Sequence, residues 1–497
     1  MADELSVDVD THSFTTLLSN ECLPLGLDSY QRGFVWGHDK TVQLVNDLNE
    51  FLEASGDMHP YYMGTILLHK DKQGKKRFII DGQQRITVLC LLYFLLYNRL
   101  PNGQELAYSG QSARYIRSAI QTLKTCNLPD AAIFDRVLFT VIVVKDADTA
   151  FTFFDTQNNR GVRLQATDLL KAYHLRAIAQ KSLCKEEGLR LQQDCAARWE
   201  RIQCLLPILS SRKDFSAELF SQFLWRARRW KGRDVVPANH DVLLEEFQSN
   251  TWDSWSDKKA SVNTVPIYAC RNNRLATAIS LQKDGLILHT NQIALGNDPS
   301  RLPIALRQPV HKGLGFFLYA DKYARLLYSL VHDKTSVIDI RVHNFRAIYK
   351  DLLMKNQQYL REAFMVSTLV YVDQFGYEKL PQFALYLEYI LGSIRLDKQQ
   401  VKRETAANFF RDSKLNLLDV IVQSYHPDQV MGYLRRLHLN YKKPYQKENI
   451  DRGKGVQGRY KKAVLTFFHG SENNEFQHLS DKWEWVEEKL KVMVHDN

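Results

Sequence analysis

A polar pentapeptide, Asp81–Arg85, separates a short β-type run from the longest apolar segment of the chain. The run before it, Arg77–Ile80, is short and β-rich, as expected of a strand. The segment after it, Ile86–Tyr97, spans 12 positions and is too long and leucine-rich for a strand. It is also shorter than the roughly 20 residues needed to cross a bilayer. The sequence therefore predicts a strand, a polar turn and a buried helix, and no membrane span.

The surrounding residues predict a mixed α/β domain. We expect a helix over 39–52 with Asp39 as its cap, and a β-hairpin formed by 61–69 and 77–80. A strand over 137–144 is expected to precede a helix near 149–154, a loop at 157–161 and a helix that Thr167 caps. Beyond about residue 180 the apolar pattern is mostly helical, as in 314–330, 345–353 and 383–394. We predict an α/β domain over 1–178 and a mostly α-helical region over 179–497.

The cysteines and the first residues indicate a reducing compartment. Seven cysteines form an odd, scattered set without a C-x-x-C pair, which argues against a disulfide framework and a structural zinc site. We expect them to be reduced and mostly buried. The first ten residues are acidic, unlike the basic start of a secretory signal. We therefore expect a cytoplasmic protein.

Positive charge is concentrated near the C-terminus. The chain has a formal net charge of +10, yet residues 1–180 hold 18 basic and 20 acidic side chains. The basic segment 435–462 holds ten basic residues and two acidic ones, and four tyrosines are interleaved with them: Tyr433, Tyr441, Tyr445 and Tyr460. This mixture is suited to phosphate contacts and base stacking, with a solvated basic loop as the alternative. A second cluster, Trp225–Arg233, permits nucleic-acid contact or the end of an amphipathic helix.

The pentapeptide has residues suited to phosphate chemistry. A helix N-terminus presents free N–H groups and the positive end of the helix dipole. Gly82 permits close approach of the backbone, Arg85 can hold a phosphate, and Gln83 or Gln84 can orient a water. Asp81 can bind Mg²⁺ or accept a proton. The alternative is a helix start with solvated amides and a salt-bridged arginine. The chain has no P-loop motif.

Four motifs resemble those of one family. They are Tyr30–Trp36 (YQRGFVW), Gly64–Ile66 (GTI), Asp81–Val88 (DGQQRITV), and Phe154–Leu164 (FDTQNNRGVRL) followed by Asp168–Lys171. In this order they are similar to the N-terminal domain of GmrSD-type, modification-dependent restriction enzymes, which has a ParB/sulfiredoxin-like α/β fold. The resemblance covers about the first third of the chain.

The resemblance implies roles for individual residues. It assigns nucleotide binding and hydrolysis to Asp81, Gly82, Gln83, Gln84 and Arg85, with GTP, ATP or CTP as the nucleotide and Mg²⁺ as the metal. It connects Tyr30, Gln31 and Arg32 with a pocket for modified DNA, which agrees with a ring that stacks on a base beside polar donors. Trp36 is expected in the core. For Asn158, Arg160 and Gly161 it favours ligand contact over a helix-capping turn.

The C-terminal region departs from the family pattern. Many members carry an HNH-type nuclease there, but His426-Pro427 and His343-Asn344 lack its spacing, and we interpret both histidines as surface or capping residues. The region is expected to bind DNA or a protein partner, with DNA contacts from Lys442, Lys443, Lys461 and Lys462.

The sequence thus predicts a nucleotide-hydrolysing, modified-DNA-sensing subunit of a bacterial antiphage restriction system. Cleavage would fall to a nuclease partner or to an unrecognised site in this chain. The alternatives are a self-contained nicking endonuclease and a non-catalytic ParB-like DNA-binding adaptor. Self-association into a homo-oligomer stays open.

Overall fold

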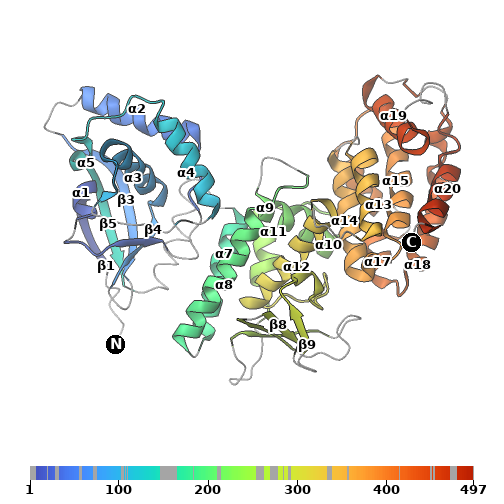
Figure 1. Cartoon of the computed structure of the whole chain (residues 1–497), viewed down its shortest axis with the longest axis horizontal. Helices are drawn as coiled ribbons and strands as arrows, with labels where there is room; N and C mark the ends of the chain where they lie inside the picture. Colours follow the sequence, from blue (N-terminus) through green and yellow to red (C-terminus); the bar gives the residue numbers. More distant parts are fainter. Residues whose placement is uncertain are drawn as a thin grey trace. The chain divides into compact units, whose positions relative to one another are not determined.

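The computed structural model divides into two compact units, Met1–Gln180 with Cys184–Cys204, and Lys181–Leu183 with Leu205–Asn497. Each unit is described by itself (Figure 1). The residues that the structure describes are 7–19, 21–27, 33–54, 59–70, 75–101, 106, 108, 110–145, 165–182, 184–209, 214–252, 262–268, 278–283, 285–288, 293–332, 339–354, 358–412, 415–447, 450–451, 454–470 and 478–495.

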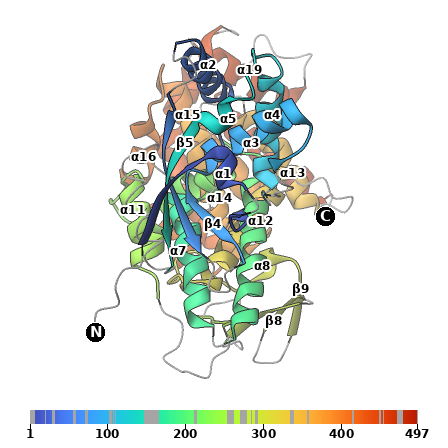
Figure 2. The ribbon, with the colours of Figure 1, turned by 90° about the vertical axis from the view of Figure 1, so that its left-hand side faces the viewer.

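The first unit contains a mixed five-stranded sheet with the order β1-β5-β3-β4-β2. Two of its strands, β4 and β5, are labelled in Figure 2. Strand β3 pairs parallel to β5 and antiparallel to β4, so the predicted hairpin and the predicted strand at 137–144 are confirmed. Strand β1 pairs antiparallel to β5, and β2 pairs parallel to β4. The strands are β1 (Val7–Ser13), β2 (Leu25–Leu27), β3 (Tyr61–Lys70), β4 (Arg77–Asp81) and β5 (Val137–Val144).

Helices of the first unit cover the sheet according to the alternation of its side chains. Ile66, Leu68 and Ile79 pack into the larger core, which includes residues of α2, α3 and α4. Their neighbours Leu67 and Ile80 point to the opposite face, where Ala172 of α7 packs. The helices are α1 (Phe14–Leu17), α2 (His38–Ala54), α3 (Gln83–Tyr97), α4 (Gly110–Leu123), α5 (Ile133–Arg136), α7 (Ala166–Lys181) and α8 (Lys185–Gln203).

Several predicted details of this unit change. Asp39 lies in the first turn of α2 and is not its cap, because the helix begins at His38. Thr167 is likewise not the cap of α7. The carbonyl of Gln165 accepts the first hydrogen bonds of this helix, so Thr167 lies inside the helix, where its side chain is buried. The helix expected near 149–154 and the loop at 157–161 lie outside the described residues.

The second unit is mostly helical, as predicted, and helices α12, α13 and α15 overlap the three predicted there. Nearly every residue of α15 is buried, so this helix lies at the centre of the core. The elements are α9 (Phe215–Glu218), η3 (Leu219–Leu224), α10 (Trp225–Arg229), α11 (His240–Leu244), η4 (Glu245–Ser249), η6 (Pro299–Arg301), α12 (Leu314–Val331), α13 (Ile340–Ile348), η7 (Tyr349–Leu353), α14 (Gln358–Phe375), α15 (Leu380–Asp397), α16 (Arg403–Arg411), α17 (Leu417–Gln423), α18 (Pro427–Leu437), η8 (His438–Tyr441), η9 (Lys443–Gln446), α19 (Gly455–His469) and α20 (Lys482–His495).

A four-stranded antiparallel sheet within this unit was not predicted. Its order is β6-β7-β8-β9, and the strands have three to five residues each. Such short runs are hard to separate from loops by periodicity. The strands are β6 (Thr264–Pro266), β7 (Ala278–Gln282), β8 (Gly285–Leu288) and β9 (Ile293–Gly296).

The structure bears on two further expectations, the absence of a membrane-spanning helix and the burial of the cysteines. Among the described residues, no helix is both long and apolar enough to span a bilayer. Of the six described cysteines only Cys195 is buried, while Cys184 and Cys204 are exposed. The expectation that the cysteines are mostly buried was therefore wrong for this part of the chain.

Candidate functional site

The pentapeptide forms a tight junction between β4 and α3. Strand β4 ends at Asp81, and Gly82 caps the helix with φ of 97°, a left-handed conformation that favours glycine. A Cβ atom at Gly82 would lie 3.1 Å from Ile66 Cγ1, so the backbone also packs closely against β3. The helix begins at Gln83, three residues earlier than predicted, because Gly82 supplies the turn. Gln83, Gln84 and Arg85 are therefore first-turn residues of the helix.

Arg85 joins this first turn to strand β3. Its Nη1 donates to the carbonyl of Met63 and its Nη2 to the carbonyl of Thr65, both at 2.6 Å. Between them Gly64 has φ of 99°, and a Cβ there would lie 2.6 Å from Arg85 Nη1. The Gly64–Ile66 motif and the pentapeptide thus form one interlocked unit. Each terminal nitrogen keeps a second N–H, while Asp81 lies 3.6 Å from Nη2.

Gln84 joins the same turn to the segment that follows Tyr30, Gln31 and Arg32. Its Oε1 accepts from the backbone N–H groups of Val35 at 2.9 Å and Trp36 at 3.2 Å, and its Nε2 donates to the carbonyl of Gly33 at 3.1 Å. Trp36 packs against the core with part of its surface exposed, in agreement with the prediction. Tyr30, Gln31 and Arg32 themselves lie outside the described residues, as do Asn158, Arg160 and Gly161.

Gln83 differs from its neighbour. Its side chain is only 5% exposed, and its Oε1 has no hydrogen-bond partner among the described residues. Gly82 at the N-cap has no side chain that could bond to the N–H groups of the first turn, and no described side chain caps this helix. Of the alternative interpretation, the solvated amides are wrong, since Gln83 and Gln84 are both buried, whereas the salt-bridged arginine is confirmed by the pair of Arg85 and Asp81. Asp81 remains exposed over half of its side chain. This junction combines an uncapped helix N-terminus, a buried polar group without a partner and an accessible carboxylate.

The described residues of the basic segment 435–462 lie mostly in helices, so the alternative of a solvated basic loop does not hold for them. The segment runs from the end of α18 through η8 and η9 into α19. Tyr445 and Tyr460 are buried and bond to Lys482, which pairs with Glu388 at 2.7 Å. The expectation that these two rings stack on bases was wrong, because they are part of the core. Lys442, Lys443 and Lys462 are exposed and Lys461 partly so.

One groove gathers cations of this segment with residues of α13, η7 and α20. It has a volume of about 710 Å³, and its lining includes one acidic residue, Asp351 of η7, among the described residues. The cations of the lining are Arg459 and Lys462 of α19 and Lys489 of α20. None of these three pairs with a carboxylate among the described residues, and Lys489 lies 5.5 Å from the centre of the Phe467 ring. Sequence reasoning missed Lys489. The spacing of Arg459, Lys462 and Thr466, typical of one helix face, was the available signal for the α19 side.

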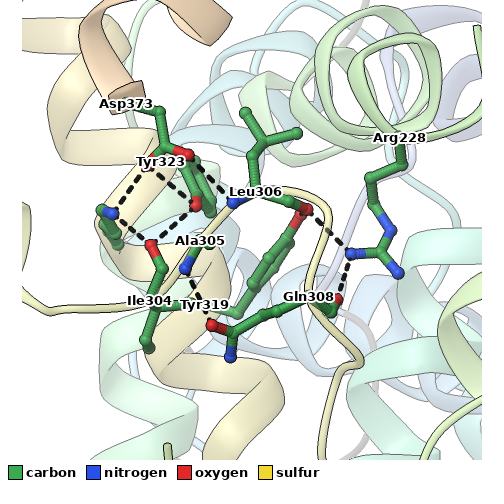
Figure 3. A network of polar contacts seen from close by, with 9 residues as sticks. Arg228, Ile304, Ala305, Leu306, Gln308, Tyr319, Tyr323 and Asp373 are labelled. Atoms are coloured by element: carbon green, nitrogen blue, oxygen red, sulfur yellow. Dashed lines mark hydrogen bonds and ion pairs between the residues drawn. The ribbon is translucent and has the colours of Figure 1, made fainter. Parts of the chain in front are cut away.

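The Trp225–Arg233 cluster is structural. Both indoles donate to the carbonyl of Val236, and Arg226 pairs with Glu362 at 2.8 Å. Arg228 pairs with Glu246. It also donates to the carbonyls of Leu306 and Gln308, in the network of Figure 3. There Asp373 also accepts from the backbone of Leu306 and from Lys322 and Tyr323. The alternative of a helix end is therefore correct for Trp225–Arg229, whose arginines fix the neighbouring loop.

Metal-ligand sets are not found among the described residues, where no group of three or more His, Cys, Asp or Glu side chains could hold an ion. His426 caps α18, since its Nδ1 accepts from the backbone of Asp428 at 3.2 Å, as the capping interpretation predicted. His343 lies within α13.

Two families match the chain. Residues 191–452, more than half of the chain, match the Family of unknown function (DUF7834), and the chain belongs to this family. Residues 14–175 match the GmrSD restriction endonuclease, N-terminal domain. The resemblance drawn from the four motifs is confirmed, and the first unit is a GmrSD-type domain that supports a role in restriction. No curated protein matches the chain.

Proposed function

We propose that the chain is a nucleotide-hydrolysing, DNA-sensing component of a bacterial GmrSD-type restriction system. The observation that carries this proposal is the β4–α3 junction, where the buried Oε1 of Gln83 has no hydrogen-bond partner among the described residues and Gly82 gives the helix N-terminus no side-chain cap. A buried amide oxygen without a hydrogen bond costs about 1–3 kcal/mol, a cost that a bound water or ligand would remove.

The junction offers each part of a phosphoryl-transfer site. The N–H groups of the first turn of α3 would receive a phosphate, and Gln83 would orient the attacking water. The remaining N–H groups of Arg85 are available for a second phosphate contact. Asp81 would hold Mg²⁺ together with phosphate oxygens, because Mg²⁺ commonly uses one or two carboxylates plus phosphates. Gly82, Asn158, Arg160 and Gly161 complete the proposed nucleotide contacts, on the basis of the family resemblance.

DNA would be contacted in two places. Tyr30, Gln31 and Arg32 would read the modified base, and the following segment, Gly33–Trp36, is held by Gln84. The groove formed by Arg459, Lys462 and Lys489 would bind backbone phosphates, because its cations lack carboxylate partners among the described residues and an aromatic ring lies beside them. Cleavage would then be carried out by a nuclease partner or elsewhere in the chain.

Nucleotide hydrolysis is the direct test. Phosphate release from GTP, ATP and CTP is measured with Mg²⁺, with and without modified and unmodified DNA. We expect Gln83→Leu to abolish turnover without loss of stability, since the parent atom bonds to no described residue. Unchanged turnover in this variant would remove the junction from the mechanism. Metal-dependent nicking of DNA without nucleotide hydrolysis would favour the self-contained endonuclease. DNA binding that responds to nucleotide, again without hydrolysis, would favour the non-catalytic adaptor.

Salt titrations of DNA affinity test the groove. Each phosphate contact to a duplex contributes about −0.9 to the slope of log K against log salt. Replacing Arg459, Lys462 and Lys489 by Gln should reduce the magnitude of this slope by about 3. Replacing Lys442 and Lys443 by Gln tests separately whether these two exposed lysines of the basic segment contact phosphates. Equal slopes in parent and groove variant would mean that the groove is only a solvated face.

Base selectivity tests the motif at Tyr30. Stacking is worth about 1–3 kcal/mol per base, so Tyr30→Ala should reduce the preference for modified DNA by about 5- to 150-fold while basal hydrolysis is retained. A destabilised variant that keeps its preference would contradict this role.

A further inference from the structure

The first turns of three helices meet at one pocket of the second unit. Tyr359 of α14, Arg403 of α16 and Val456 of α19 line it together with residues 399–402, and its volume is about 610 Å³. Each of these residues is the first or second of its helix. Because N–H groups and the positive end of the dipole are found at a helix N-terminus, the pocket receives three such ends.

The side chains at these helix ends add positive charge. Lys402 precedes α16, Arg403 begins it, and Lys454 precedes α19. Cations are unfavourable at helix N-termini, where proteins prefer acidic residues. Among the described residues, none of these three cations pairs with a carboxylate. Arg403 is close enough to Arg226 that its charge contributes to lowering the pKa of that guanidinium, after the larger effect of burial.

Nearby carboxylates leave this charge only partly balanced. Glu404 lies in the first turn of α16, and the carboxylate of Asp451 lies close to Gly455, at the start of α19. Asp397, at the end of α15, pairs with Lys447 at 3.0 Å. Among the described residues, the lining of the pocket itself includes two cations and no carboxylate.

A buried arginine lies directly behind the wall of the pocket. Arg395 of α15 is 0% exposed, and its Nη2 donates to the backbone carbonyls of Lys398 and Gln399, of which Gln399 lines the pocket. Its Nε and Nη1 have no hydrogen-bond partner among the described residues. It also has no ion pair with a described carboxylate, and burial lowers its pKa. A buried, unpaired guanidinium is costly unless a negative charge compensates it.

We propose that this pocket binds the phosphate groups of a nucleotide-sized ligand. The amides of the three helix ends, Lys402 and Arg403 receive the phosphate, and Arg395 supplies positive potential from behind the wall. Tyr359, Val401 and Val456 offer an aromatic and apolar surface to the organic part of the ligand, and Gln399 and Gln400 offer amides. The volume lies within the roughly 300–1,000 Å³ typical of small-molecule sites. This site is independent of the β4–α3 junction.

Binding of inorganic pyrophosphate and ADP, with adenosine as the uncharged comparison, tests the proposal. The full chain is titrated calorimetrically, and hydrogen exchange of the peptides 399–405 and 455–460 reports binding at this pocket separately from binding elsewhere. We expect both phosphate compounds to bind and to slow exchange in these peptides, whereas adenosine does neither. In Lys402→Gln/Arg403→Gln the dissociation constant for this site should rise at least about tenfold, because two charge-assisted contacts are lost.

The matched control is Lys75→Gln/Lys76→Gln, which removes the same charge from adjacent exposed positions of the first unit. The control should bind like the parent. The pocket variant should also melt at a higher temperature than the parent without ligand, since repulsion at the helix ends is relieved. Equal weakening in both variants, or the absence of protection in the two peptides at millimolar pyrophosphate, would overturn the proposal.

Discussion

Replacing one or the other of the adjacent glutamines at the start of α3 by leucine is expected to have very different effects on stability. Gln84→Leu keeps most of the side-chain volume but removes the partners of three backbone groups in Gly33, Val35 and Trp36. Each such group contributes about 1 kcal/mol when bonded and costs more when buried without a partner. Because the three groups are partly buried, we expect a loss of about 2–3 kcal/mol. Gln83→Leu removes an atom that bonds to no described residue and should cost less than about 1 kcal/mol.

Hydrogen exchange is the appropriate assay because the chain has two compact units, and global unfolding need not be two-state. A local loss of 2–3 kcal/mol corresponds to exchange of the Val35 and Trp36 amides that is roughly 30- to 160-fold faster. Gln83→Leu should leave these amides as in the parent. If both variants accelerate exchange equally, or if Gln84→Leu does not, the assignment of the hydrogen bonds to Gln84 is refuted.

Three further outcomes are expected. Arg85→Ala should lower both turnover and stability, the latter by about 2 kcal/mol, because it leaves the carbonyls of Met63 and Thr65 without their donor; an unchanged melting temperature would contradict this. Gly392→Ala should cost about 3 kcal/mol or more in denaturant titrations, since its Cβ would overlap Tyr460 Oη. Gly432→Ala should be tolerated, because the nearest atom to its Cβ would be Arg436 Nη1 at 3.7 Å, an ordinary van der Waals contact. Burial lowers the pKa of His311 to about 4. The neutral imidazole therefore stabilises the folded state above pH 6.5, and this contribution should fall by about 3 kcal/mol as the pH drops from 6.5 to 4. Urea titrations at pH 4.5 and 7 measure the effect, and His311→Asn should make the free energy of unfolding less dependent on pH.

Local patterns predicted much of the first unit. The apolar run after Arg85 required a buried helix, and β-rich runs on either side of a polar turn required a hairpin, because both signals are carried by neighbouring residues. The exact start of α3 was not predictable, since glycine is compatible with a loop and with a left-handed cap. The roles of the two glutamines were also hidden, because Gln84 bonds to residues about 50 positions away.

The second unit shows why charge counts mislead. Tyr445 and Tyr460 stand among lysines in sequence, yet their hydroxyls bond to Lys482, a residue outside the basic segment. In the same way, Arg226 and Arg228 meet Glu362 and Glu246, which are far away along the chain. The number of cations in a run of sequence is therefore only an upper limit to the number on a basic surface, because some of them are neutralised by ion pairs with residues elsewhere in the chain. Arg459 and Lys462 remained accessible because they lie on the outer face of α19.

The three hydrogen bonds of Gln84 have a thermodynamic consequence for the proposed activity. They connect the first turn of α3, where a nucleotide would bind, with the backbone immediately after Tyr30, Gln31 and Arg32, where DNA would bind. If nucleotide at α3 changes the free energy of this connection, it changes the affinity for DNA by some factor, and DNA must then change the affinity for nucleotide by the same factor. Restriction would be sensitive to DNA modification through this reciprocity, and a variant at Gln84 would lose the coupling while both ligands still bind.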